Sequence, residues 1–264
     1  MAKTRGAKLK PDFATIAGLM LAAVGILGGL ILEGGSIRDI MQHTAAIIVL
    51  GGTLGAVMVN TPMATLKGAA SRVSEVLFEG TQDPRQRVET LVDYATKARK
   101  QGIVALEAEL ALVNDPFLKK AISLAIDGAD LQDIRSMLDL EIGLREHRCE
   151  QEAKVFESAG GYAPTIGIIG AVLGLIQVMK NLSNVEEVGH GIAVAFVATV
   201  YGVAVSNLLF LPAANKIKAR AREHAEMMEM TVEGVTGIVE GMNPKLLRLK
   251  LEAFVHGPPP KGKR

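Results

Sequence analysis

Four stretches of this sequence contain no Asp, Glu, Lys or Arg over 20 residues or more. They cover residues 13–32, 44–66, 158–179 and 191–215. An α-helix rises about 1.5 Å per residue, so about 20 apolar residues cross the ~30 Å hydrocarbon core of a bilayer. The pattern therefore predicts an all-α membrane protein with four transmembrane helices.

The composition agrees with this interpretation. The mean hydropathy is +0.28 although 22% of the residues are charged, so apolar and charged residues lie in separate blocks. The single cysteine, Cys149, excludes a disulfide scaffold. The 29 basic and 28 acidic side chains leave a net charge of +1, which argues against a nucleic-acid binder.

The charges beside the spans predict the orientation. Cytoplasmic flanks carry an excess of Lys and Arg. Cations precede the first span and follow the fourth: Lys3, Arg5, Lys8, Lys10, Lys216, Lys218, Arg220 and Arg222. Both termini are therefore expected in the cytoplasm. The first span is expected to be retained, because residues 30–33 (LILE) offer no signal-peptidase site.

The spans divide the chain into five regions. We expect a cytoplasmic N-terminus (1–12), spans 1 and 2 (13–66), a cytoplasmic helical domain (67–157), spans 3 and 4 (158–215), and a cytoplasmic helix with a basic tail (216–264). The 67–157 region is highly charged and shows no strand-like alternation. Its helical spacing is clearest where Val88, Leu91, Val92 and Ala95 recur.

Small residues four apart mark possible helix contacts within the spans. Such pairs are Gly25/Gly29, Gly51/Gly55, Gly167/Ala171 and Gly170/Gly174. Pro164 in the third span and Pro212 in the fourth permit bends, although Pro164 could equally begin a helix. Thr199 could either face a partner or bond back to its own helix.

No span contains an Asp, Glu, Lys, Arg or His. A proton relay needs a titratable group in the membrane, so a partner would have to supply the carboxylate. Without one, the chain would be a passive scaffold. The sequence also lacks a phosphate-binding loop, an H-E-x-x-H motif and paired Cys or His ligands. We therefore expect no enzyme activity and no cofactor or metal.

Three segments resemble the MotA/PomA family of flagellar motor stator subunits. These are YAPTIGIIGAVLGL at 162–175, VAFVATVYG at 194–202, and ARKQGIVALE at 98–107. The resemblance covers nearly the whole chain. It implies a homopentamer in the bacterial inner membrane, surrounding two copies of a MotB-like subunit that brings the intramembrane Asp. Ion flow would then turn the ring against the rotor protein FliG and drive motility.

The resemblance also implies roles for individual residues. Pro164, Ala171 and Thr199 would line the ion path, and Pro212 would bend the fourth helix. Arg99, Lys100 and Glu107 would contact the rotor. Sodium-driven relatives carry further acids after the position of Glu107, whereas this chain has Ala108 and Leu110 there, with Glu109 between them.

The same comparison bears on the ion. Sodium-driven relatives tend to have threonine where this chain has Ala171, which offers no oxygen ligand to a desolvated sodium ion. The transported ion is therefore expected to be the proton.

The alternative to a flagellar stator subunit is an ExbB/TolQ-type energiser of outer-membrane processes, but those relatives have three spans and an outside N-terminus.

Overall fold

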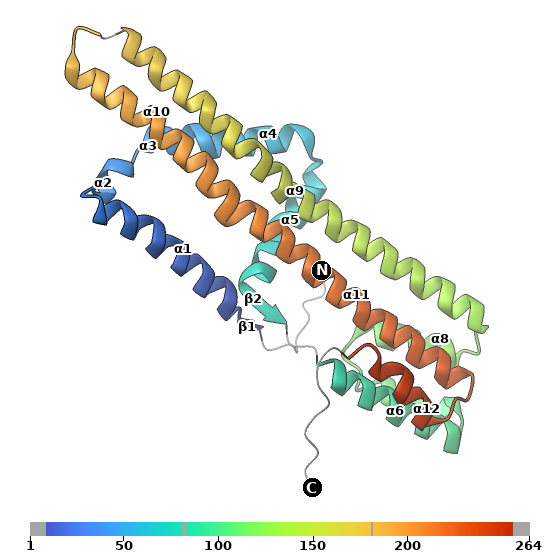
Figure 1. The fold of residues 1–264 in the computed structure, drawn as a ribbon. Coiled ribbons are helices and arrows are strands. Elements are labelled where there is room, and N and C mark those ends of the chain that lie inside the picture. The colour runs from blue at the N-terminus through green and yellow to red at the C-terminus, as the bar shows by residue number, and fades with distance from the viewer. Residues whose placement is uncertain (1–8, 81–82, 181, 256–264) are drawn as a thin grey trace. The chain divides into compact units, whose positions relative to one another are not determined.

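The computed structural model describes residues 9–80, 83–180 and 182–255, which are almost entirely helical (Figure 1). These residues form two compact units. The membrane unit combines Leu9–Gly80 with Cys149–Ala219, and the polar unit combines 83–148 with 220–255. The chain enters each unit twice, and the long helices α9 (Leu131–Lys180) and α11 (Leu211–Val239) each contribute to both.

The four predicted spans are confirmed as helices long and apolar enough to cross a membrane. The first is α1 (Phe13–Leu32), with the predicted bounds, and the third lies in α9. The second and fourth each contain one wider π-helical turn. The second runs through α3 (His43–Ala46), the turn Ile47–Gly51 and α4 (Gly52–Asn60). The fourth runs through α10 (Val185–Val205), the turn Ser206–Phe210 and the start of α11.

The second span ends six residues earlier than the charge pattern predicted. The helix stops at Asn60, and α5 (Met63–Leu77) starts after Thr61 and Pro62. Proline has no backbone N–H and restricts the residue before it to extended geometry. Thr61 has the extended backbone angles that this rule requires. The apolar run to Leu66 therefore belongs to two helices.

Two short strands, which the sequence analysis did not predict, join the start of α1 to the end of α5. β1 (Leu9–Pro11) pairs antiparallel with β2 (Phe78–Gly80), with Lys10 opposite Glu79. Beyond the strands, the Asp12 amide donates to the Leu77 carbonyl over 2.9 Å. The Asp12 carboxylate then caps α1 by accepting from the Thr15 amide.

The polar unit consists of helices, and the starts of α6, α8 and α12 are capped by acidic or amide side chains. They are α6 (Pro84–Gln101), a 3₁₀ turn (Ile103–Leu106), α7 (Glu107–Leu110), α8 (Pro116–Ile126) and α12 (Pro244–Glu252), with parts of α9 and α11. Asp83, Asp115 and Asn243 cap α6, α8 and α12, each directly before a proline. Gly102 ends α6 in the left-handed region, at φ 83°.

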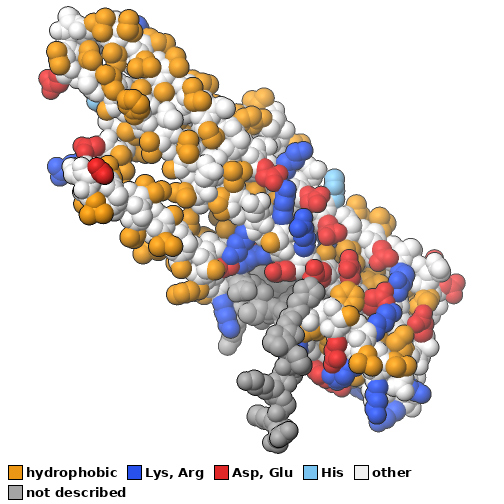
Figure 2. All heavy atoms as spheres, viewed as in Figure 1, with side chains coloured by type: hydrophobic (Ala, Val, Ile, Leu, Met, Phe, Trp, Pro, Cys, Tyr) orange, Lys and Arg blue, Asp and Glu red, His pale blue; other side chains and the backbone are white. Residues whose placement is uncertain are grey.

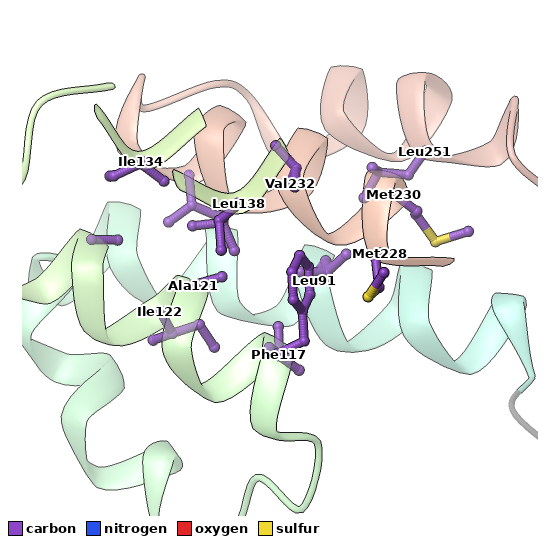
Figure 3. Close-up of a cluster of buried hydrophobic side chains, with 14 of the residues drawn as sticks. Leu91, Phe117, Ala121, Ile122, Ile134, Leu138, Met228, Met230, Val232 and Leu251 are labelled. Atoms are coloured by element: carbon purple, nitrogen blue, oxygen red, sulfur yellow. The ribbon is translucent and has the colours of Figure 1, made fainter. Parts of the chain in front are cut away.

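One hydrophobic core holds the polar unit together (Figure 3). The four predicted apolar positions of α6 are buried there, together with Phe117 and Ile122 of α8 and Leu138 of α9. Helix α12, which the sequence analysis did not predict, adds Leu247 and Leu251, both fully buried. The segment 220–255 thus belongs to the same core as 83–148.

Apolar and charged side chains are distributed differently over the two units. Figure 2 shows hydrophobic side chains in the open over the membrane unit, and Lys, Arg, Asp and Glu concentrated over the polar unit. No residue of α1 is buried within the chain. Such a helix requires an apolar environment, which a lipid bilayer provides.

Candidate ion-path and rotor-contact sites

Helices α9 and α10 run side by side with their backbones in close approach (Figure 1). A Cβ atom on Gly202 would lie 2.5 Å from the Ala163 carbonyl oxygen. At Gly167 it would lie 2.9 Å from the Ala198 carbonyl oxygen, and at Gly174 2.9 Å from that of Gly191. The glycines therefore permit contacts that any side chain would block. By contrast, a Cβ on Gly25, Gly29, Gly51 or Gly55 would meet nothing within 4 Å in the described chain.

The three predicted ion-path residues lie around this contact. Pro164 and Ala171 are seven residues apart on α9 and share one face of the helix with Gly167. A Cβ on Gly167 would lie 3.4 Å from the Cα of Thr199 on α10. Pro164 lies inside the 50-residue helix α9, so it is not a helix-start residue. Pro164, Ala171 and Thr199 are all half-buried within the single chain.

The hydroxyl of Thr199 bonds back to its own helix. Its Oγ1 donates to the Ala195 carbonyl over 3.3 Å. This corresponds to one of the two alternatives that the sequence left open. A hydroxyl keeps acceptor capacity while it donates, so this bond leaves Thr199 able to accept a hydrogen bond.

The fourth helix widens directly before Pro212. Its π-helical turn ends at Phe210, and Pro212 is exposed on the first turn of α11. Wider turns of this kind relieve the clash that a proline ring makes with the preceding turn. The buried Ser206 begins the π turn and donates to the Gly160 carbonyl over 2.6 Å, which ties the fourth span to the third.

Tyr201 connects the fourth span to the loop before the second, a contact not anticipated from the sequence. Its hydroxyl donates to the Ile40 carbonyl over 2.5 Å and accepts from the Gln42 amide over 3.4 Å. Ile40 ends the short helix α2 (Ile37–Ile40). Beside this link, Ala45, Val49 and Ala198 are fully buried. The aromatic hydroxyl was the available signal, since a Tyr in an apolar span needs a polar partner.

Ion pairs join the elements at the end of the membrane unit where α1 begins. Lys216 contacts both the Asp12 carboxylate and the Thr15 hydroxyl. The hydrogen bond from Lys216 holds the pKa of Asp12 well below its usual range. Arg72 of α5 donates to Glu152 of α9 over 2.7 Å, and Glu152 is only 7% exposed. These pairs fix α1 to α11 and α5 to α9.

The three predicted rotor-contact residues lie close to one turn of the polar unit. Arg99 and Lys100 are in the last turn of α6, and Glu107 starts α7. All three are exposed, and none has an ion pair among the residues that the structure describes. Glu109, the alternative acid, is instead bound by Lys97. The free charges at this turn are therefore Arg99, Lys100 and Glu107.

Arg99 also borders a pocket of about 370 Å³. Its walls come from the ends of α6, α8 and α11 and include Ala98, Ile103, Ala129 and Met242.

Across the described ranges of the chain, no group of three or more His, Cys, Asp or Glu could hold a metal ion.

Comparison of the sequence with known proteins gives matches over nearly the whole chain. Residues 16–102 match the family model described as Motility protein A N-terminal, and residues 109–230 match the MotA/TolQ/ExbB proton channel family. Motility protein A of Bacillus subtilis is 35% identical over 92% of this chain and 91% of its own length. Chemotaxis protein PomA of Vibrio alginolyticus is 31% identical over 93% of this chain and 96% of its own.

Two solved structures have the same fold over most of their length. The chain superposes on a chain of the C. jejuni MotAB structure with a TM-score of 0.90, at 31% identity and with 96% and 99% of the two chains covered. For the flagellar MotAB stator complex of Bacillus subtilis the TM-score is 0.85, at 34% identity, with 91% and 94% covered. The resemblance found in the sequence is thereby confirmed: the chain belongs to the MotA/PomA family of flagellar stator subunits.

Proposed function

We propose that this chain forms a homopentamer around two MotB-like subunits and converts proton flow into torque on the rotor. The observation that carries the proposal is the pairing of α9 with α10. Pro164, Ala171 and Thr199 lie around the contact of these two helices, and none of the four spans contains an Asp, Glu, Lys, Arg or His. A carboxylate from a partner helix would complete an ion site that this chain cannot form alone.

The available energy is sufficient for such work. One elementary charge that crosses 100 mV releases about 2.3 kcal/mol, before any concentration gradient is added. Loading and release of the partner's Asp would turn the ring around the partner. The orientation that we propose places both termini and the polar unit in the cytoplasm, next to the inner membrane, because the cations flank spans 1 and 4 on that side.

The polar unit would act on the rotor through Arg99, Lys100 and Glu107. These exposed charges have no ion pair with any residue of the described ranges, so they are available to a charged partner, which we propose to be FliG. Reversal of one such charge should abolish torque. The Arg99→Asp variant is expected to assemble but not to support swimming.

Lys119→Asp is the matched control for Arg99→Asp. Lys119 is also exposed on the polar unit and has no described ion pair, but it lies on α8. Swimming speed and stator assembly should be measured for both variants. Normal swimming of Arg99→Asp would refute the rotor contact.

An ExbB/TolQ-type role is not favoured, because the N-terminal motility model and full-length motility relatives match this chain.

The ion is tested by removing sodium at constant proton-motive force. Cells that depend on this chain and its partner are expected to keep their swimming speed, because Ala171 offers no oxygen to a desolvated sodium ion. A stall that sodium reverses would identify a sodium-driven stator and assign the ligands to Thr199 and backbone oxygens.

A further inference from the structure

The membrane unit contains a second, larger pocket of about 530 Å³ beside α1. Helix α1 forms one wall, the last turn of α5 and Phe156 of α9 form another, and the segment 207–216 closes it. Most of its lining is apolar, including Leu19, Val76 and Phe210. On α1 the wall carries Ala14, Gly18 and Ala22, and a Cβ on Gly18 would meet no atom within 4 Å in the described chain.

The depth of the pocket matches one leaflet of a bilayer. From Ala14 to Ala22 the wall of α1 rises about 12 Å, and the antiparallel wall from Asn207 to Lys216 rises about 14 Å, at 1.5 Å per residue. One leaflet contributes about 15 Å of hydrocarbon. The pocket therefore begins at the edge of the membrane and reaches to about its middle.

The end of the pocket at the membrane edge, its shallow end, carries the ammonium group of Lys216. Lys216 Nζ has three hydrogens, of which one contacts Asp12 and one the Thr15 hydroxyl. The third has no acceptor among the residues that the structure describes and is available to an anionic oxygen, and Lys216 is only partly buried. The side-chain amide of Asn207, which also lines the pocket, donates to the Val203 carbonyl of its own helix. The pocket is thus mostly apolar along its length and ends at the Lys216–Asp12 ion pair, where the ammonium group of Lys216 can donate one more hydrogen bond.

We propose that this pocket binds a phospholipid, with one acyl chain between α1 and α11 and the phosphate at Lys216. The lipid would fill the space that the small residues of α1 leave open and would connect α1 to the rest of the membrane unit. In the proposed orientation of the chain, this lipid would belong to the cytoplasmic leaflet. Only the choice of leaflet rests on the proposed function, and the binding itself does not. Binding and motility are therefore tested separately.

The test is native mass spectrometry of the full-length chain purified with its partner subunit. After delipidation, the complex is titrated with dioleoyl-phosphatidylglycerol. Wild type is expected to bind the probe saturably. Ala22→Phe, which fills the pocket, should lose at least about tenfold in affinity. Ala23→Phe is the control, because Ala23 is exposed on the same helix but does not line the pocket, and it should bind as wild type does.

A second titration isolates the phosphate and needs no variant. Dioleoylglycerol has the same chains without the phosphate, so it should bind about tenfold more weakly, the effect of one charge-assisted hydrogen bond. Equal binding of the two probes would overturn the assignment to Lys216. The pocket assignment fails if wild type shows no saturable binding or if Ala22→Phe binds normally. It also fails if Ala22→Phe changes the number of copies in a complex that carries no lipid, because a neighbouring copy then fills the pocket.

Discussion

At the scale of single residues, glycine determines how closely the third and fourth spans approach. Four glycines of α9 and α10 face backbone or Ala atoms at distances that a Cβ cannot occupy: Gly167, Gly170, Gly174 and Gly202. Two of them form the Gly170/Gly174 pair that the sequence indicated. Gly167 was indicated through its pair with Ala171, whereas Gly202 was not. Spacing alone could not tell which pairs make such contacts, because Gly25, Gly29, Gly51 and Gly55 show the same spacing without them.

The Gly202→Ala substitution should destabilise this contact. Its methyl group would lie 2.5 Å from the Ala163 carbonyl oxygen, so the helices must separate, at a cost of about 1–3 kcal/mol. Thermal unfolding in detergent should show a lower midpoint. Gly25→Ala serves as the control, since its methyl meets no atom within 4 Å of the described chain. Equal midpoints for the two variants would contradict the close contact.

Thr53→Val, unlike Gly202→Ala, should not destabilise the protein. Thr53 of α4 is fully buried, and its hydroxyl has no hydrogen-bond partner within the described part of the chain. Valine has the same shape without the polar group, so the variant should be as stable as wild type or more stable by about 1 kcal/mol. A lower unfolding midpoint would mean that the hydroxyl is bonded in the assembled protein.

At the scale of elements, the sequence predicted the long helices better than their ends. Span 1 was predicted residue for residue, because charged or turn-forming residues lie on both sides of it. The break at Pro62 was missed because the apolar run continues to Leu66. Strands of three residues and the nine-residue α12 were missed because so few positions establish no period. Pro164, Pro212 and Thr199 were noticeable in the sequence as prolines and a hydroxyl within apolar spans, but the roles predicted for the site residues came from the family resemblance.

The link between α5 and α9 depends on one ion pair. Glu152 is 7% exposed, and a Cβ on Gly68 would overlap its carboxylate, so α5 packs directly on this acid. Arg72→Gln would leave the buried Glu152 without its charge partner, which should destabilise the fold by about 3 kcal/mol. The double variant Arg72→Gln/Glu152→Gln should recover part of the loss. Thermal midpoints of wild type, Arg72→Gln, Glu152→Gln and the double variant give the coupling, and an additive result would refute it.

At the scale of the whole molecule, the polar unit and the four spans should respond differently to acid. Ion pairs join the helices of the polar unit, whereas the spans themselves contain no Asp, Glu, Lys or Arg. Burial alone would raise the pKa of Glu233, but hydrogen bonds and charges from Lys250 and Arg135 lower it below its usual 4.5. This stabilisation is present above pH 4.5 and is lost as the pH falls further.

Hydrogen exchange, corrected for intrinsic rates, should therefore show the polar unit loosening below about pH 4.5 while the spans stay protected. Glu233→Gln should weaken that dependence, with an effect of about 1 kcal/mol at neutral pH. Glu240→Gln is the control, because Glu240 has no described ion pair and directly follows α11, the helix that carries Glu233. Equal loosening of the polar unit and the spans would contradict the prediction.

The π-helical turn in the second span has a consequence for changes in chain length. Such a turn accommodates one residue more than an α-helical turn, so it holds a residue that the span could lose. Deletion of the exposed Leu50 could convert Ile47–Gly51 into an ordinary turn and leave both flanks in register. Deletion of Leu54 in α4 would instead rotate all that follows by about 100° and displace Val57 from its buried position. The second span is therefore expected to tolerate the deletion of Leu50 but not the deletion of Leu54.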